Sequence, residues 1–97
     1  MPMVTAIILF TISRGRVNEV AERLAALPGV AEVYSVAGRY DLAAIVRVQR
    51  NEDLADLVTG HMVGMDGIAA TETLISFRAF NKKDIEAGFA LGGEGGR

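Results

Sequence analysis

Residues 3–12 read Met-Val-Thr-Ala-Ile-Ile-Leu-Phe-Thr-Ile, a run rich in β-branched residues that predicts a β-strand. Successive side chains of a strand point to opposite faces. Both faces of this strand are apolar, one with Val4, Ala6, Ile8 and Phe10 and the other with Ile7 and Leu9. A strand that is apolar on both faces is expected to be covered on both.

Two helices and three further strands are predicted after this run. Apolar residues recur at helical spacing up to Leu27, where Pro28 ends the helix because proline cannot continue the hydrogen-bond ladder. Asn51 is a favourable N-cap for a second helix, which should end near Gly64. The expected helices span 17–27 and 51–64, and the expected strands span 30–37, 40–48 and 68–80.

The order β-α-β-β-α-β predicts an α+β fold, a ferredoxin-like antiparallel sheet with both helices on one face. Two helices cover only one face of such a sheet, so a second copy is expected to cover the other. The result would be a homodimer resembling a dimeric α/β barrel, which a charge at Val4, Ile7 or Leu9 should split. Residues 1–80 would form the domain, and 81–97 a C-terminal extension whose last residues are disordered.

Composition excludes several classes of protein. The 97 residues suit one domain, and their net charge of -2 includes no basic stripe, so direct nucleic-acid binding is not expected. There is no cysteine, which excludes disulfides and thiolate metal sites. No apolar stretch approaches the length of a membrane span, so a cytoplasmic protein is expected.

Side chains suited to catalysis are scarce. His61 is the single histidine, and its place on the second helix favours a partly exposed helix residue over a proton-transfer group. Glu52, Asp53 and Asp56 favour the positive end of the helix dipole rather than a metal ion. No catalytic residue, metal ligand or cofactor is predicted.

Gly38-Arg39-Tyr40-Asp41 is the first candidate binding motif. It could be simply a hairpin turn, in which Gly38 supplies a positive φ and Asp41 bonds nearby amides. Alternatively, the Asp41 carboxylate could meet an ammonium group while free loop amides bind a carboxylate, which would suit an amino acid.

Thr71-Glu72-Thr73 is the second candidate. Two threonines two positions apart share a strand face, so Thr71 and Thr73 could together orient a ligand. Packing alone also explains threonine in a strand.

These motifs resemble the ligand-binding (RAM) domain of Lrp/AsnC transcription regulators. The resemblance covers about residues 3–80 and includes Leu27-Pro28-Gly29-Val30, Val36-Ala37-Gly38-Arg39-Tyr40-Asp41 and Ile68-Ala69-Ala70-Thr71-Glu72-Thr73. It implies sheet-to-sheet dimers, which often assemble further into octamers, with an amino-acid effector between dimers. The implied ligand-binding residues are Gly38, Arg39, Tyr40, Asp41, Thr71 and Thr73, and the last two are expected to reach the site across the interface.

Full-length members of that family carry a helix-turn-helix domain before this module, whereas the first strand here begins almost at Met1. The resemblance therefore implies a stand-alone, non-enzymatic module, which oligomerises and could act on a full-length Lrp/AsnC relative. Two alternatives remain: a small dimeric α+β-barrel enzyme, monooxygenase- or isomerase-like, and an oligomerisation adaptor without a ligand.

Overall fold

The computed structural model describes residues 3–80 and residue 82. Four strands and two helices follow one another in the expected order, and the second helix continues into a π-helical turn, η1. The elements are β1 (Val4–Ile12), α1 (Val17–Ala25), β2 (Val30–Ser35), β3 (Leu42–Val48), α2 (Asn51–Leu57), η1 (Val58–Met62) and β4 (Ile68–Ile75).

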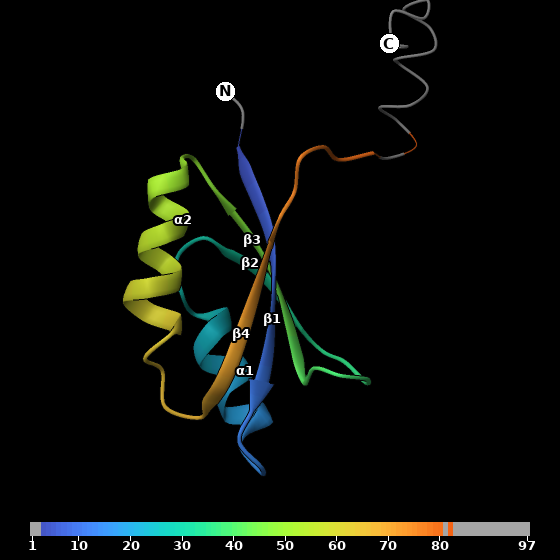
Figure 1. Cartoon of the computed structure of the whole chain (residues 1–97), viewed down its shortest axis with the longest axis vertical. Helices are drawn as coiled ribbons and strands as arrows, with labels where there is room; N and C mark the ends of the chain where they lie inside the picture. Colours follow the sequence, from blue (N-terminus) through green and yellow to red (C-terminus); the bar gives the residue numbers. More distant parts are fainter. Residues whose placement is uncertain (1–2, 81, 83–97) are drawn as a thin grey trace, which may run out of the picture.

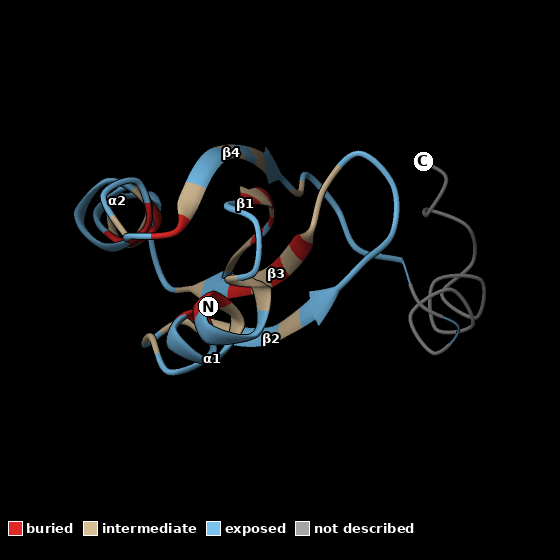
Figure 2. Cartoon of the chain, turned by 90° about the horizontal axis from the view of Figure 1, so that it is seen from below, coloured by how far each residue is buried: buried red, intermediate tan, exposed pale blue. Residues whose placement is uncertain are grey.

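The four strands form one antiparallel sheet in the order β2-β3-β1-β4. Both helices lie against one face of this sheet (Figure 1). The view along the strands shows the same two layers (Figure 2). The ferredoxin-like α+β fold expected from the sequence is therefore confirmed.

The core lies between the sheet and the helices. Its fully buried side chains alternate along β1 and β3 and follow the inner faces of the helices, and they include Ile8, Phe10, Val20, Leu24, Leu42, Val46 and Met62. Within the described residues, no polar side chain is buried. Burial of each large aliphatic or aromatic side chain contributes about 1.5–3 kcal/mol, so this single apolar layer is the main source of stability.

The face of the sheet away from the helices, called the open face below, carries residues that stand opposite one another in the strand registers. They are Glu32, Tyr34, Ala43, Ile45, Arg47, Thr5, Ile7, Leu9, Thr11, Ala70, Glu72 and Leu74. Ile7 lies on the central strand β1 and yet is 38% exposed, and Leu74 is 44% exposed. The open face thus has an apolar centre bordered by polar side chains, and it has no cover within the described chain.

The structure corrects the expectation about Val4. This residue packs against the helix-side core, so it does not belong to the face at which a charge was expected to split a dimer. The alternation of β1 fixes this, because Val4 has the same parity as Ala6 and Ile8.

Several boundaries and one strand register also differ from expectation. Arg50 rather than Asn51 is the N-cap of α2, and it forms no side-chain capping bond. Strand β4 ends at Ile75 instead of Phe80, because pairing with β1 ends there. A register shift between Val30 and Glu32 places these two residues on different faces of β2. The proposed extension at 81–97 lies outside the described residues, apart from residue 82.

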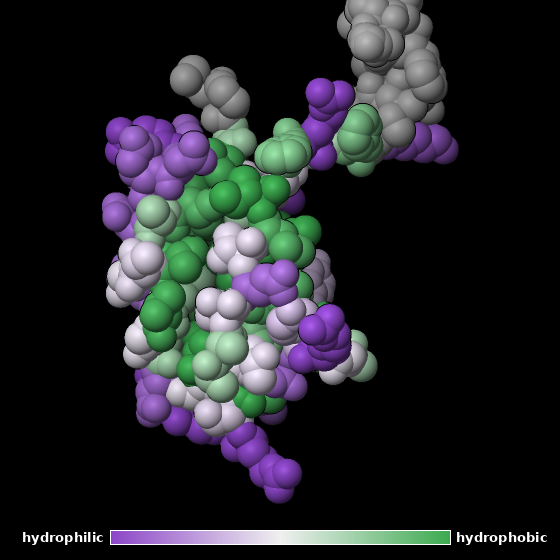
Figure 3. Space-filling view, in the orientation of Figure 1, coloured by the Kyte–Doolittle hydropathy of each residue, from purple (hydrophilic) through white to green (hydrophobic). Residues whose placement is uncertain are grey.

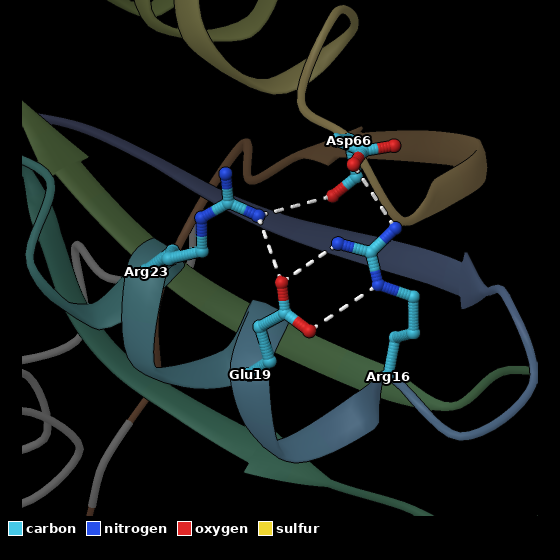
Figure 4. A network of polar contacts seen from close by, with 4 residues as sticks. All are labelled: Arg16, Glu19, Arg23 and Asp66. Carbon is cyan, nitrogen blue, oxygen red and sulfur yellow. Dashed lines mark hydrogen bonds and ion pairs between the residues drawn. The ribbon is translucent and has the colours of Figure 1, made fainter.

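A network of charged side chains ties α1 to the turn before β4 (Figure 4). Arg16 lies 2.7 Å from the Glu19 carboxylate and 3.1 Å from the Asp66 carboxylate. Arg23 contacts Glu19 from the next turn and also donates to the backbone carbonyl of Asp66. The hydrogen bond from Arg16 lowers the pKa of Glu19 below its ordinary value.

Candidate functional site

The hairpin loop between β2 and β3 carries the first group of predicted site residues. Gly38 has φ +131°, a conformation that side chains disfavour, and Arg39 beside it is exposed. The hairpin projects on the side of the sheet away from the helices (Figure 1). The turn role expected for Gly38 is thereby confirmed.

Asp41 does more than close the turn. Its Oδ2 accepts a hydrogen bond from the backbone N–H of Ile12 at 2.7 Å, and its own N–H donates to the carbonyl of Phe10 at 2.8 Å. Its carbonyl accepts a bond from Val36, which closes the hairpin. Asp41 is therefore fixed by β1 as well as by the loop, so its carboxylate has a defined position.

The amides of the hairpin loop have no protein partner among the described residues. Within the described residues, the N–H groups of residues 37–40 donate to no protein acceptor. Exposed N–H groups in a tight loop are donors suited to a carboxylate. The hairpin thus places a fixed carboxylate and unused donors within one short segment.

Tyr40 links this loop to the open face. Its hydroxyl donates a hydrogen bond to the carboxylate of Glu72 on β4, reaching across β1, which lies between β3 and β4. This bond raises the pKa of Tyr40, because the neighbouring carboxylate disfavours the phenolate. Glu72 was overlooked as a partner, although it stands between the two predicted threonines.

Thr71 and Thr73 lie on the other face of the sheet. They stand opposite Phe10 and Ile8 in the register, which places them on the helix side, whereas Tyr40 and Glu72 meet on the open face. A single chain therefore does not bring the two predicted groups together.

A cleft of about 390 Å³ opens at the other end of β3, far from the hairpin along that strand. Met3, Pro28, Gly29, Arg47, Val48, Gln49, Asp53, Asp56, Leu57 and His61 line it. His61 is exposed, as expected for a helix-surface residue. Within the described part of the chain, no group of three acidic or histidine side chains is arranged to hold a metal ion.

Comparison with known proteins assigns the family. The family model described as the Lrp/AsnC ligand binding domain matches residues 5–85. The chain belongs to the Lrp/AsnC ligand-binding domain family. Within residues 3–80 and residue 82, no helix is long and apolar enough to cross a membrane.

The curated relatives of this Lrp/AsnC domain are transcription regulators. It is 41% identical over 60 residues to the uncharacterized HTH-type transcriptional regulator PH1916 of Pyrococcus horikoshii, covering 62% of this chain and 40% of that protein. It is 34% identical over 73 residues to the HTH-type transcriptional regulator FL11 of Pyrococcus furiosus, covering 74% of this chain and 47% of that protein. The chain thus spans less than half the length of these relatives.

Solved structures confirm the fold of the Lrp/AsnC domain. TTHA0845 from Thermus thermophilus is 46% identical with a TM-score of 0.77, covering 81% of this chain and 99% of that one. The transcriptional regulator NMB0573 from Neisseria meningitidis, solved as a complex with L-Met, is 14% identical with a TM-score of 0.74, covering 80% of this chain and 52% of that one. The second likeness concerns the fold alone.

Proposed function

We propose that this Lrp/AsnC domain is a non-enzymatic regulatory module that binds an amino acid at the β2–β3 hairpin and dimerises through the open face of its sheet. The uncovered apolar face carries the proposal. Apolar patches of this kind on a soluble domain mark interaction sites. A second copy related by a two-fold axis presents the same apolar residues, so the two faces match each other.

The chemistry of the hairpin suits a zwitterion. Asp41 uses one carboxylate oxygen to bind Ile12, and the other oxygen remains able to accept bonds from an ammonium group. The amides of residues 37–40 supply donors for a carboxylate. Gly38, Arg39, Tyr40 and Asp41 are therefore the residues proposed to contact the effector within one subunit.

Thr71 and Thr73 enter this proposal only through a neighbouring subunit, because they lie on the opposite face of their own sheet. An effector held between subunits would favour assemblies larger than the dimer, up to an octamer. The L-Met complex of NMB0573, which shares the fold, supports an amino acid as the class of ligand.

The regulatory role rests on the relatives, which are transcription regulators. We propose that residues 1–80 act as the module and that it works in the cytoplasm without contacting DNA, either alone or in mixed assemblies with a full-length Lrp/AsnC relative. The net charge of -2 supports the absence of a nucleic-acid-binding surface. Residues 81–97 would form an extension of the module.

Native mass spectrometry with and without a panel of amino acids tests both parts of the proposal. We expect a dimer or larger assembly, and a mass increase of one amino acid per site. The ligand should also raise the melting temperature, since at a hundred times the Kd it contributes about 2.7 kcal/mol per site. A monomer throughout would refute the assembly, and a full panel without bound mass or thermal shift would refute the effector.

A further inference from the structure

The segment that follows β4, residues 76–80, is called the arm below. Phe77 on this arm is fully exposed, and Phe80 is 71% exposed. Both are large apolar side chains, and the two residues before the arm, Leu74 and Ile75, are also exposed. Together they form a run of apolar side chains that the described chain leaves in solvent.

The arm leaves the sheet at a defined point. Pairing of β4 with β1 ends at Ile75 opposite Ala6, and the last bond runs from the N–H of Ser76 to the carbonyl of Thr5. The arm then turns to the side of the sheet away from the helices (Figure 1). The view from below shows it on that same side (Figure 2). The space-filling view shows apolar surface continuing from the sheet toward the arm (Figure 3).

We propose that the arm docks on a second copy of this chain, with Phe77 as its apolar anchor. The inference rests on the proposed dimer through the open face and adds a contact which that face does not itself contain. The two-fold axis would give each dimer two such arms, one from each subunit.

The arm is long enough to contact a second copy packed on the open face. Two sheets that pack face to face lie about 10 Å apart. Five extended residues span up to about 17 Å. An arm that starts at the rim of one sheet therefore crosses the gap and arrives at the neighbouring subunit. Leu74 lies on the open face two residues before the arm begins, so the proposed contact is continuous with the proposed dimer interface.

A tryptophan placed at the anchor provides a direct test, because the chain contains no tryptophan. In Phe77→Trp, emission should shift to the blue and resist acrylamide quenching at concentrations where the protein is dimeric. Both properties should be lost on dilution to the monomer. They should also be lost when Ile7→Glu, which is designed to separate the subunits, is combined with Phe77→Trp. Val63→Trp, at an exposed apolar residue on the turn after η1, is the matched control and should stay accessible throughout.

The dimer dissociation constant provides a second measure. Phe77→Ser should raise it by at least about tenfold, as expected for loss of an apolar anchor at an interface, whereas Val63→Ser should leave it unchanged. Unaltered dimerisation of Phe77→Ser, or an indole in Phe77→Trp that stays accessible in a proven dimer, would overturn the arm contact and leave the open-face dimer standing. If the indole of Phe77→Trp is protected from quenching in the monomer, residues of the same chain cover it, and the arm contact with a second copy would be overturned. A monomeric native chain would refute the dimer itself and the arm contact with it.

Discussion

The Asp41 carboxylate accepts a hydrogen bond from the backbone N–H of Ile12, which lies 29 residues earlier in the chain and 2.7 Å away. Ile12 is the last residue of β1 and is buried. The bond thus satisfies a backbone donor that water reaches poorly. A residue that the sequence marks as part of a turn also stabilises the end of the central strand.

We expect Asp41→Ala to lower the free energy of unfolding by about 1–3 kcal/mol, because it leaves the N–H of Ile12 without an acceptor. Asp41→Asn should lower the free energy of unfolding by less, since the amide oxygen of asparagine can still accept the hydrogen bond from Ile12. Chemical denaturation at one fixed protein concentration measures both, because dimerisation makes stability depend on concentration. Equal stability of Asp41→Ala and the native chain would show that this bond contributes nothing.

Glu72→Gln should lower the pKa of Tyr40 toward its ordinary value of 10.0, because the carboxylate that disfavours the phenolate is removed. The raised pKa means that the folded state holds the phenol proton more tightly. The Tyr40–Glu72 hydrogen bond therefore contributes its full stabilisation at pH values below the ordinary tyrosine pKa. This stabilisation is lost as the pH rises through the pKa of Tyr40 in the folded state. Phenolate absorbance in a Tyr34→Phe background isolates Tyr40, and an unchanged titration midpoint would contradict the contact.

Gly67 and Gly15 offer a matched pair, since both have positive φ, at +100° and +80°. An added Cβ at Gly67 would lie 2.7 Å from Cγ2 of Val20, whereas at Gly15 it would meet nothing within 4 Å. Gly15→Ala should therefore cost about 1–2 kcal/mol from the backbone alone, and Gly67→Ala about 1–3 kcal/mol more from overpacking. Thermal and chemical unfolding measure the difference, and similar losses would argue against the close approach.

The lowered pKa of Glu19 predicts a pH-dependent contribution from the network on α1. The ion pair with Arg16 stabilises the fold above the ordinary glutamate pKa of 4.5 and is lost as the pH falls through the lower, folded value. The stability difference between the native chain and Glu19→Gln should thus vanish in acid, and it should shrink in high salt. Glu22→Gln, on the same helix and outside the network, is the control; a difference that persists in acid would contradict this origin.

Ile7→Glu should separate the proposed dimer, because it places a charge at the centre of the open face. Val63→Glu adds the same charge to an exposed apolar residue elsewhere and should leave the assembly intact. Light scattering after gel filtration compares the two. If Ile7→Glu retains the native mass, the open face is not the interface.

The fold was predictable because its signals are local. Alternation along β1 identified both of its faces, and Pro28 marked the end of the first helix region. The exact boundaries depend on pairing, which is not local. β4 ends at Ile75 because its pairing with β1 stops at Ala6, and the register shift in β2 separates Val30 from Glu32. Neither feature has a sequence signal of its own.

The candidate site was predictable only in part. The sequence identified the hairpin and the positive φ of Gly38, because glycine and turn chemistry are local properties. It did not show that Tyr40 reaches Glu72 or that Asp41 binds Ile12, since both contacts depend on β1 lying between β3 and β4. The face occupied by Thr71 and Thr73 likewise follows from their register with β1.

The π-helical turn at Val58–Met62 has a consequence for chain length. Leu57 and Met62 are both buried although they are five residues apart, a spacing that a regular α-helix would turn by about 140° away from a common side. The wider turn, closed by the bond from the N–H of Val63 to the carbonyl of Val58, brings both into the core. In a relative with one residue fewer between the positions of Leu57 and Met62, a regular α-helix would place both side chains in the core. A one-residue deletion at this point would therefore leave the rest of the fold unchanged.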